Sequence, residues 1–179
     1  MNLPNLLTAL RLALTPVIVY LIVRHDLRSA VLVTFIAGIS DAFDGYLARR
    51  LQVTSRLGAY LDPIADKVML VAVYLALGAV EAFPAWLVWL VLGRDVLILL
   101  MAIAGWLLFR FRDFPPSKYG KISTFLQMMA AGTALMAGAF PLPAFTALVT
   151  PFILGAAAGT ILSGAHYVWL ALSRVRARI

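Results

Sequence analysis

Long apolar runs separated by short polar turns cover almost the whole chain. A helix needs about 20 apolar residues to cross the hydrocarbon core of a bilayer. Runs of this length predict six helices, at residues 5–23, 29–51, 57–80, 85–109, 122–140 and 145–172. Charged residues, glycine or proline stand at the turns between them. We therefore expect an all-α integral membrane protein, with six transmembrane helices that form a single domain over residues 1–179.

The composition supports a membrane protein rather than a soluble protein with a large core. Hydrophobic residues make up 63% of the chain and charged residues only 13%, whereas soluble domains average about 45–50% and 25%. Cysteine is absent, which excludes disulfides and thiolate metal sites. The net charge is +7. In a membrane protein, such a charge marks cytoplasmic loops and contacts with anionic head groups, so we expect no nucleic-acid partner.

The basic residues also predict the orientation in the membrane. Six spans place both termini on the same side. Ten basic residues fall on that side: Arg49, Arg50, Arg56, Arg110, Arg112, Lys118, Lys121, Arg174, Arg176 and Arg178. Only Arg24 and Arg28 fall on the other. Because cytoplasmic loops are enriched in Lys and Arg, we expect both termini to be cytoplasmic, in a bacterial inner membrane.

Four carboxylates interrupt the apolar pattern where the second predicted helix ends and the third begins. They are Asp41, Asp44, Asp62 and Asp66, half of the eight acidic residues within a stretch of 26. Carboxylates at the edge of hydrocarbon are costly unless they pair or bind a cation. Residues three or four apart share a helical face, so the two pairs form stripes that can face each other. Oxygen ligands without His or Cys favour Mg²⁺, Mn²⁺ or Ca²⁺ over zinc.

Two other interpretations of these carboxylates stay open on physical grounds alone. They could form interhelical salt bridges with the cations inside the predicted spans, Arg11, Lys67 and Arg94. They could also form an ion or proton pathway, because buried carboxylates in membranes often carry charge. Arg49, which follows the first stripe, instead favours a phosphate ligand. Carboxylates, a divalent metal and nearby cations together indicate phosphoryl chemistry on a diphosphate.

The spacing resembles the signature of the CDP-alcohol phosphotransferase family. Its pattern is Asp-x2-Asp-Gly-x2-Ala-Arg-x8-Gly-x3-Asp-x3-Asp, and all eight fixed positions match from Asp41 to Asp66. The resemblance implies a six-helix homodimer that transfers a phosphatidyl-type group from CDP-diacylglycerol to an alcohol and releases CMP. It implies two divalent cations, Mg²⁺ or Mn²⁺, held by Asp41, Asp44, Asp62 and Asp66, with Asp66 also the general base. The positions that contact the CDP moiety match Asp41, Gly45, Ala48, Arg49 and Gly58.

Four further stretches of the sequence concern the acceptor alcohol. Residues 3–11, 61–67, 93–95 and 117–127 resemble the phosphatidylglycerophosphate synthase and cardiolipin synthase branch. The acceptors of both enzymes, glycerol 3-phosphate and phosphatidylglycerol, carry a phosphate. We expect four basic residues to bind it: Arg94, Lys121, Lys118 and Arg11. Glycerol 3-phosphate is favoured, and phosphatidylglycerol is the alternative.

The sequence also predicts the roles of several residues outside the motif. Arg94 should face substrate, because adjacent helical residues point about 100° apart and a direct pair with Asp95 is awkward. Lys67 follows Asp66 and would either join the site or anchor to head groups. Gly155 and Gly159 favour close helix packing within the chain over a dimer contact. The two histidines, His25 and His166, have no ligand partner at helical spacing and should be structural.

Overall fold

Six α-helices make up the part of the chain that this computed structural model describes. Its backbone is described for residues 3–51, 56–109 and 117–176, and its side chains for residues 9–39, 64–105, 107 and 117–174. The helices are α1 Leu3–Val23, α2 Leu27–Leu51, α3 Arg56–Ala79, α4 Ala85–Phe109, α5 Lys118–Ala139 and α6 Pro143–Arg176. The described residues contain no strand, so the predicted all-α class and helix order are confirmed.

Three of these helices are long and apolar enough to cross a membrane. The qualifying stretches among the described residues are Ala85–Gly105, Lys118–Ala139 and Pro143–Arg174. Helices α1 and α2 contain shorter apolar segments, Ala9–Val23 and Leu27–Ile39. The chain is therefore an integral membrane protein by length and composition. That all six helices cross the bilayer, and that both termini are cytoplasmic, stay predictions.

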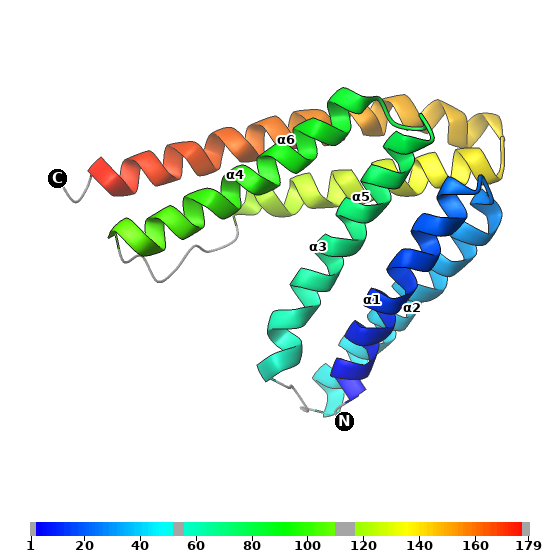
Figure 1. Cartoon of the computed structure of the whole chain (residues 1–179), viewed down its shortest axis with the longest axis horizontal. Coiled ribbons are helices and arrows are strands. Elements are labelled where there is room, and N and C mark those ends of the chain that lie inside the picture. The colour runs from blue at the N-terminus through cyan, green and yellow to red at the C-terminus, as the bar shows by residue number, and fades with distance from the viewer. Residues whose placement is uncertain (1–2, 52–55, 110–116, 177–179) are drawn as a thin grey trace.

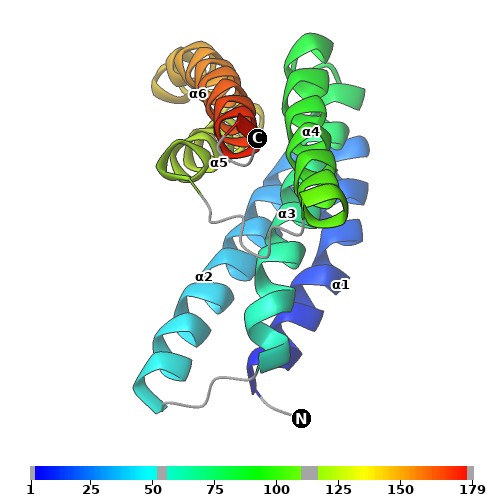
Figure 2. The same cartoon turned by 90° about the vertical axis from the view of Figure 1, so that its left-hand side faces the viewer.

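The helices form two groups of three that meet at one end and diverge at the other. Figures 1 and 2 show α1, α2 and α3 in one group and α4, α5 and α6 in the second. Helix α1 packs against both α2 and α3, while α6 packs against both α4 and α5. The turns that join α1 to α2, α3 to α4 and α5 to α6 gather at the closed end (Figure 1). The helix ends that carry the predicted motif therefore lie on the open side.

The turn from α1 to α2 shows which structural role His25 has. Its φ of 59° is left-handed, a conformation that ends many helices. The His25 N–H donates to the Ile22 carbonyl and the Asp26 N–H to the Leu21 carbonyl, both at 2.9 Å. Asp26 Oδ1 then accepts a hydrogen bond from the Ser29 N–H at 3.2 Å, which caps the start of α2. His25 is therefore structural, as expected.

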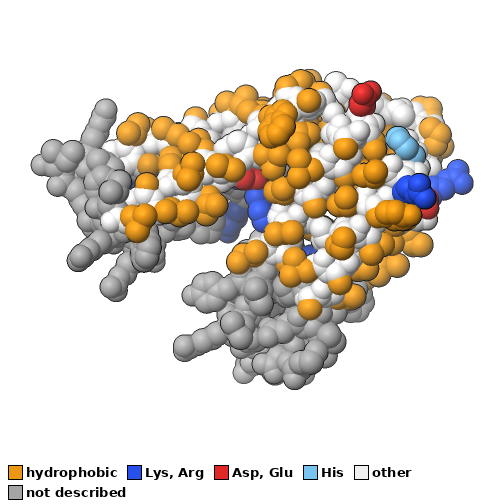
Figure 3. Space-filling view, in the orientation of Figure 1, with side chains coloured by type: hydrophobic (Ala, Val, Ile, Leu, Met, Phe, Trp, Pro, Cys, Tyr) orange, Lys and Arg blue, Asp and Glu red, His pale blue; other side chains and the backbone are white. Residues whose placement is uncertain are grey.

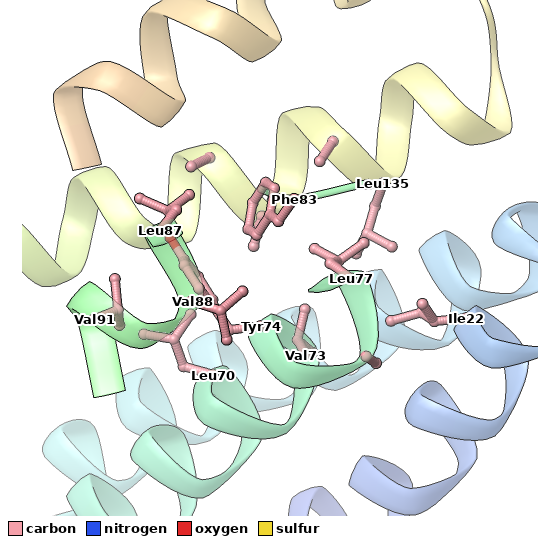
Figure 4. Packing of buried hydrophobic residues seen from close by; sticks show 14 of the residues in the cluster. Ile22, Leu70, Val73, Tyr74, Leu77, Phe83, Leu87, Val88, Val91 and Leu135 are labelled. Atoms are coloured by element: carbon pink, nitrogen blue, oxygen red, sulfur yellow. The ribbon is translucent and has the colours of Figure 1, made fainter. Parts of the chain in front are cut away.

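The apolar core lies at the closed end and joins the two groups. Figure 4 shows side chains from α3, α4, α5 and α1 packed around Phe83, in the turn between α3 and α4. The Phe83 ring centroid is 4.9 Å from that of Tyr74, and both residues are fully buried. Leu77 and Leu87 are fully buried beside them. This packing fixes α3 against α4 and thereby sets how the open side is arranged.

Helices α5 and α6 approach closely at the predicted small-residue pair. A Cβ on Gly159 would lie 3.3 Å from the Ser123 Cα, and one on Gly155 would lie 3.6 Å from Leu126 Cδ2. Between the same helices, the buried Gln127 donates to Thr160 Oγ1 at 2.9 Å. The glycines therefore serve packing within the chain, which confirms that expectation.

Candidate functional site

The motif lies on two helix ends at the open side of the molecule. Asp41, Asp44, Gly45, Ala48 and Arg49 belong to the last turns of α2, and Gly58 and Asp62 to the first turns of α3. The side chains of these seven residues lie outside the described part of the structure. That the two stripes face each other therefore stays a prediction. Asp66 is the one motif carboxylate with a described side chain.

Arg11 lies directly beside Asp66. The Arg11 Nη1 forms an ion pair with Asp66 Oδ1 across the α1–α3 contact. The Arg11 side chain is 5% exposed, while that of Asp66 is 53% exposed. One turn later, Thr15 Oγ1 donates to the Arg11 carbonyl at 2.9 Å, next to Pro16, which lacks a backbone donor. Arg11 therefore lies near the motif, and the salt-bridge interpretation holds for this one aspartate.

A second group of charges lies where α3 meets α4. The Lys67 Nζ is 2.6 Å from Asp95 Oδ2, and the Arg94 Nη1 is 2.9 Å from Asp95 Oδ1. The expectation that Arg94 would not pair directly with Asp95 is therefore wrong. The Arg94 side chain is long enough to fold back to its neighbour, although the two Cβ atoms point in different directions. Lys67 belongs to this group through its ion pair with Asp95.

Helix α6 holds Arg94 from the other side. The Arg94 Nη2 donates to Ser163 Oγ, and the guanidinium carbon lies 5.8 Å from the Tyr167 ring centroid. Tyr167 Oη in turn accepts a hydrogen bond from the Ser117 N–H at 2.9 Å. A Cβ on Gly120 would lie 3.4 Å from Arg94 Nη2, so the start of α5 lies directly against the guanidinium. The Arg94 Nε is buried and has no hydrogen-bond partner among the described residues.

Lys118 and Lys121 lie in the first turn of α5. Ser117 caps this turn by accepting a hydrogen bond from the Gly120 N–H at 3.0 Å. Both lysines are exposed, and neither forms an ion pair with a described residue. The structure thus brings the turn that carries them next to Arg94, through Gly120. It places Arg11 with Asp66 instead.

Two cavities adjoin at Lys67. The first, of about 380 Å³ between α2, α3 and α5, is polar at Asp66, Lys67 and Thr124 and otherwise mostly apolar. The second, of about 530 Å³, is lined by Lys67, Arg94, Asp95 and Tyr167, with apolar side chains of α4 as its wall. Figure 3 shows basic and acidic side chains gathered in the hollow between the two helix groups. Asp66 and Lys67 thus line one cavity, and Lys67, Arg94 and Asp95 line the other.

The donor set of the motif fits a hard divalent cation. The four aspartates offer only carboxylate oxygens, which suit Mg²⁺ or Mn²⁺. Asp66 adds an exposed carboxylate that lines a cavity.

Two residues of the Arg94 group, Asp95 and Ser163, were not predicted from the sequence to take part in the site. An acidic residue inside an otherwise apolar helix was the signal that could have identified Asp95.

Comparison with known proteins shows matches along nearly the whole chain. Residues 1–171 match the family model described as CDP-alcohol phosphatidyltransferase. A rat cardiolipin synthase (CMP-forming) is 32% identical over 159 residues, which cover 78% of this chain and 51% of the relative. The CDP-diacylglycerol–glycerol-3-phosphate 3-phosphatidyltransferase of Aquifex aeolicus is 40% identical over 128 residues, covering 69% and 70%.

A probable phosphatidylglycerophosphate synthase of Mycobacterium tuberculosis is 32% identical over 177 residues, covering 96% of this chain and 82% of the relative. The chain thus spans most of the length of this relative and of the Aquifex one. It spans between 30 and 52% of four other relatives, three cardiolipin synthases and one cardiolipin synthase–hydrolase fusion protein.

Proposed function

The chain belongs to the CDP-alcohol phosphatidyltransferase family, and we propose that it transfers a phosphatidyl group from CDP-diacylglycerol to glycerol 3-phosphate. The products are phosphatidylglycerophosphate and CMP. The observation that carries this proposal is that Asp66, the last aspartate of the complete motif, directly precedes Lys67, which shares the Asp95 carboxylate with Arg94. A hydroxyl activated at Asp66 and a phosphate bound at Arg94 belong to one small acceptor.

Asp66 is proposed as the general base. It is more than half exposed and lines a cavity, so an acceptor hydroxyl can reach it. In the reaction, this hydroxyl oxygen bonds to the β-phosphorus of CDP-diacylglycerol, the bond from that phosphorus to the CMP oxygen breaks, and the proton passes to Asp66. Arg11 orients the carboxylate through their ion pair, and Asp66 accepts the proton.

The CDP moiety is proposed to bind along the ends of α2 and α3. Arg49 supplies a cation for its phosphates, and Gly45, Ala48 and Gly58 leave room for the nucleotide to approach the backbone. Asp41, Asp44, Asp62 and Asp66 are proposed to hold two divalent cations, Mg²⁺ or Mn²⁺. When bound, such ions neutralise the diphosphate and stabilise the departing CMP. The family resemblance also supports a homodimer, and the distribution of basic residues supports a site that faces the cytoplasm.

The phosphate of the acceptor is proposed to bind at Arg94, with Lys118 and Lys121 contributing from the first turn of α5 and Arg11 from the Asp66 side. Two relatives that this chain spans for most of their length are named for phosphatidylglycerophosphate synthesis, which supports glycerol 3-phosphate. One structural feature favours phosphatidylglycerol as the second candidate. The cavity at Arg94 has an apolar α4 wall that includes Val96 and Leu99, along which an acyl chain could lie.

An acceptor panel tests the proposal. The purified protein is assayed in detergent micelles with CDP-diacylglycerol, Mg²⁺ and one of glycerol 3-phosphate, phosphatidylglycerol, inositol 1-phosphate or serine, with CMP release and lipid product measured. We expect CMP and phosphatidylglycerophosphate with glycerol 3-phosphate only. Cardiolipin as the product would establish the second candidate. CMP release with none of these acceptors, together with ion flux in liposomes, would instead establish a carboxylate-based ion or proton carrier.

A further inference from the structure

Asp95 is an acidic residue in the middle of an apolar helix, outside the motif and outside the proposed reaction. Its side chain is only 13% exposed. A buried carboxylate is costly unless its charge is paired and its oxygens are satisfied. Here Arg94 donates a hydrogen bond to Asp95 Oδ1 at 2.9 Å, and Lys67 Nζ forms an ion pair with Oδ2 at 2.6 Å, although Oδ2 accepts no hydrogen bond among the described residues. The two cations come from different helices, so Asp95 joins α3 to α4 at the edge of the cavity.

This bridge determines where both cations lie. Without a carboxylate between them, Lys67 and Arg94 would repel each other. With it, the three charges sum to +1, and the group still attracts an anion. Arg94 is further held by Ser163 and by the Tyr167 ring, while its Nε has no partner among the described residues. The Arg94 guanidinium is thus held by Asp95, Ser163 and Tyr167, and its Nε–H remains as a donor that a ligand could use.

The same bridge connects the cations to Asp66. Lys67 follows Asp66 in α3, so its anchor on Asp95 also restrains the turn that carries the proposed base. Arg11 restrains Asp66 itself from α1. A series of contacts from Arg11 through Asp66, Lys67 and Asp95 to Arg94 therefore crosses from α1 to α4, at the open side of the molecule.

We propose that Asp95 is a positioning residue for the acceptor: it holds Lys67 and Arg94 together as a phosphate-binding pair at a fixed place relative to Asp66. The inference rests on the proposed function, because it assigns the pair to the acceptor phosphate. It predicts that loss of the carboxylate impairs acceptor binding far more than donor binding, although Asp95 itself contacts neither substrate.

The first test is the kinetics of Asp95→Asn. The Michaelis constant for glycerol 3-phosphate should rise about tenfold or more, since charge-assisted contacts of the misplaced cations weaken, while that for CDP-diacylglycerol changes less than about threefold. Asp95→Glu, which keeps the carboxylate, should restore most of the acceptor affinity. Glu81→Gln, in the exposed turn between α3 and α4, is the matched control and should leave both constants unchanged.

Lysine labelling gives a second measurement that does not depend on turnover. An amine-reactive reagent is applied with and without glycerol 3-phosphate, and Lys67 modification is quantified by mass spectrometry. The acceptor should protect Lys67 in the wild type and much less in Asp95→Asn. If Asp95→Asn does not fold, Lys67→Met/Asp95→Asn replaces it, because this pair of changes removes one charge of each sign. Its acceptor Michaelis constant should exceed that of Lys67→Met alone.

The outcomes separate this inference from the proposed function. A wild-type protein that releases no CMP with glycerol 3-phosphate overturns the proposed acceptor and this inference with it. An active wild type beside an Asp95→Asn variant with normal acceptor kinetics overturns the inference alone. Equal increases in both Michaelis constants, with unchanged Lys67 protection, would show that Asp95 only stabilises the α3–α4 contact.

Discussion

Replacing Arg94 by alanine is expected to weaken acceptor binding selectively. In the structure, Nη1 contacts Asp95 and Nη2 contacts Ser163, which leaves Nε as the buried donor without a described partner. One hydrogen bond from a charged donor contributes about 1.5–3 kcal/mol. Because about 1.4 kcal/mol corresponds to a tenfold change in affinity, loss of this contact should raise the acceptor Michaelis constant roughly 10- to 100-fold.

The assay measures initial rates of CMP release in mixed micelles, varying one substrate while the other saturates. Arg94→Lys keeps the charge but not the planar donor fork, so it should recover only part of the loss. Arg28→Ala is a suitable control, since Arg28 donates to the Ala139 carbonyl at 3.3 Å at the closed end. Arg28→Ala should lower the melting temperature in detergent, but it should not raise the Michaelis constant for glycerol 3-phosphate more than that for CDP-diacylglycerol.

An Arg94→Ala variant whose Michaelis constants for CDP-diacylglycerol and glycerol 3-phosphate rise by the same factor would contradict this role of Arg94. Arg94 would then be a structural residue that holds α4 to α6 through Ser163. A full loss of turnover with an unchanged acceptor constant would also contradict it, since binding and not chemistry is the step assigned to Arg94.

Three other changes give distinct results. Asp66→Asn should lower turnover about 10²- to 10⁴-fold while CDP-diacylglycerol binding, measured by equilibrium dialysis, is largely kept; full activity would exclude Asp66 as the base. Removal of divalent metal with EDTA should abolish CMP release, and Mg²⁺ or Mn²⁺ should restore it; activity that persists in EDTA would contradict the proposed metal site. Gly159→Ala should destabilise the α5–α6 contact by about 1–3 kcal/mol, because the added Cβ would lie 3.3 Å from the Ser123 Cα. Gly155→Ala meets only Leu126 at 3.6 Å and should be neutral, with both variants compared by thermal unfolding in detergent.

The all-α class and the order of the six helices were predictable from the sequence, and the sequence also proposes the region of the site. Apolar runs of bilayer length leave a chain few alternatives to helices, because backbone polar groups need partners inside hydrocarbon. The eight fixed positions from Asp41 to Asp66 could be matched to the family signature because their spacing lies along the chain, and that resemblance implies the donor chemistry. The proximity of Arg11 to the motif was also predictable, since a deeply placed arginine needs an anion.

Which charged side chains pair could be seen only in the folded structure. Helical spacing argued against a contact between Arg94 and Asp95, yet the two side chains meet at 2.9 Å. Lys67 is 28 positions from Asp95 in the sequence but 2.6 Å from it in space, because the core around Tyr74 and Phe83 folds α3 against α4. Contacts between helices depend on how the helices pack and how long side chains bend, and neither is encoded in local spacing.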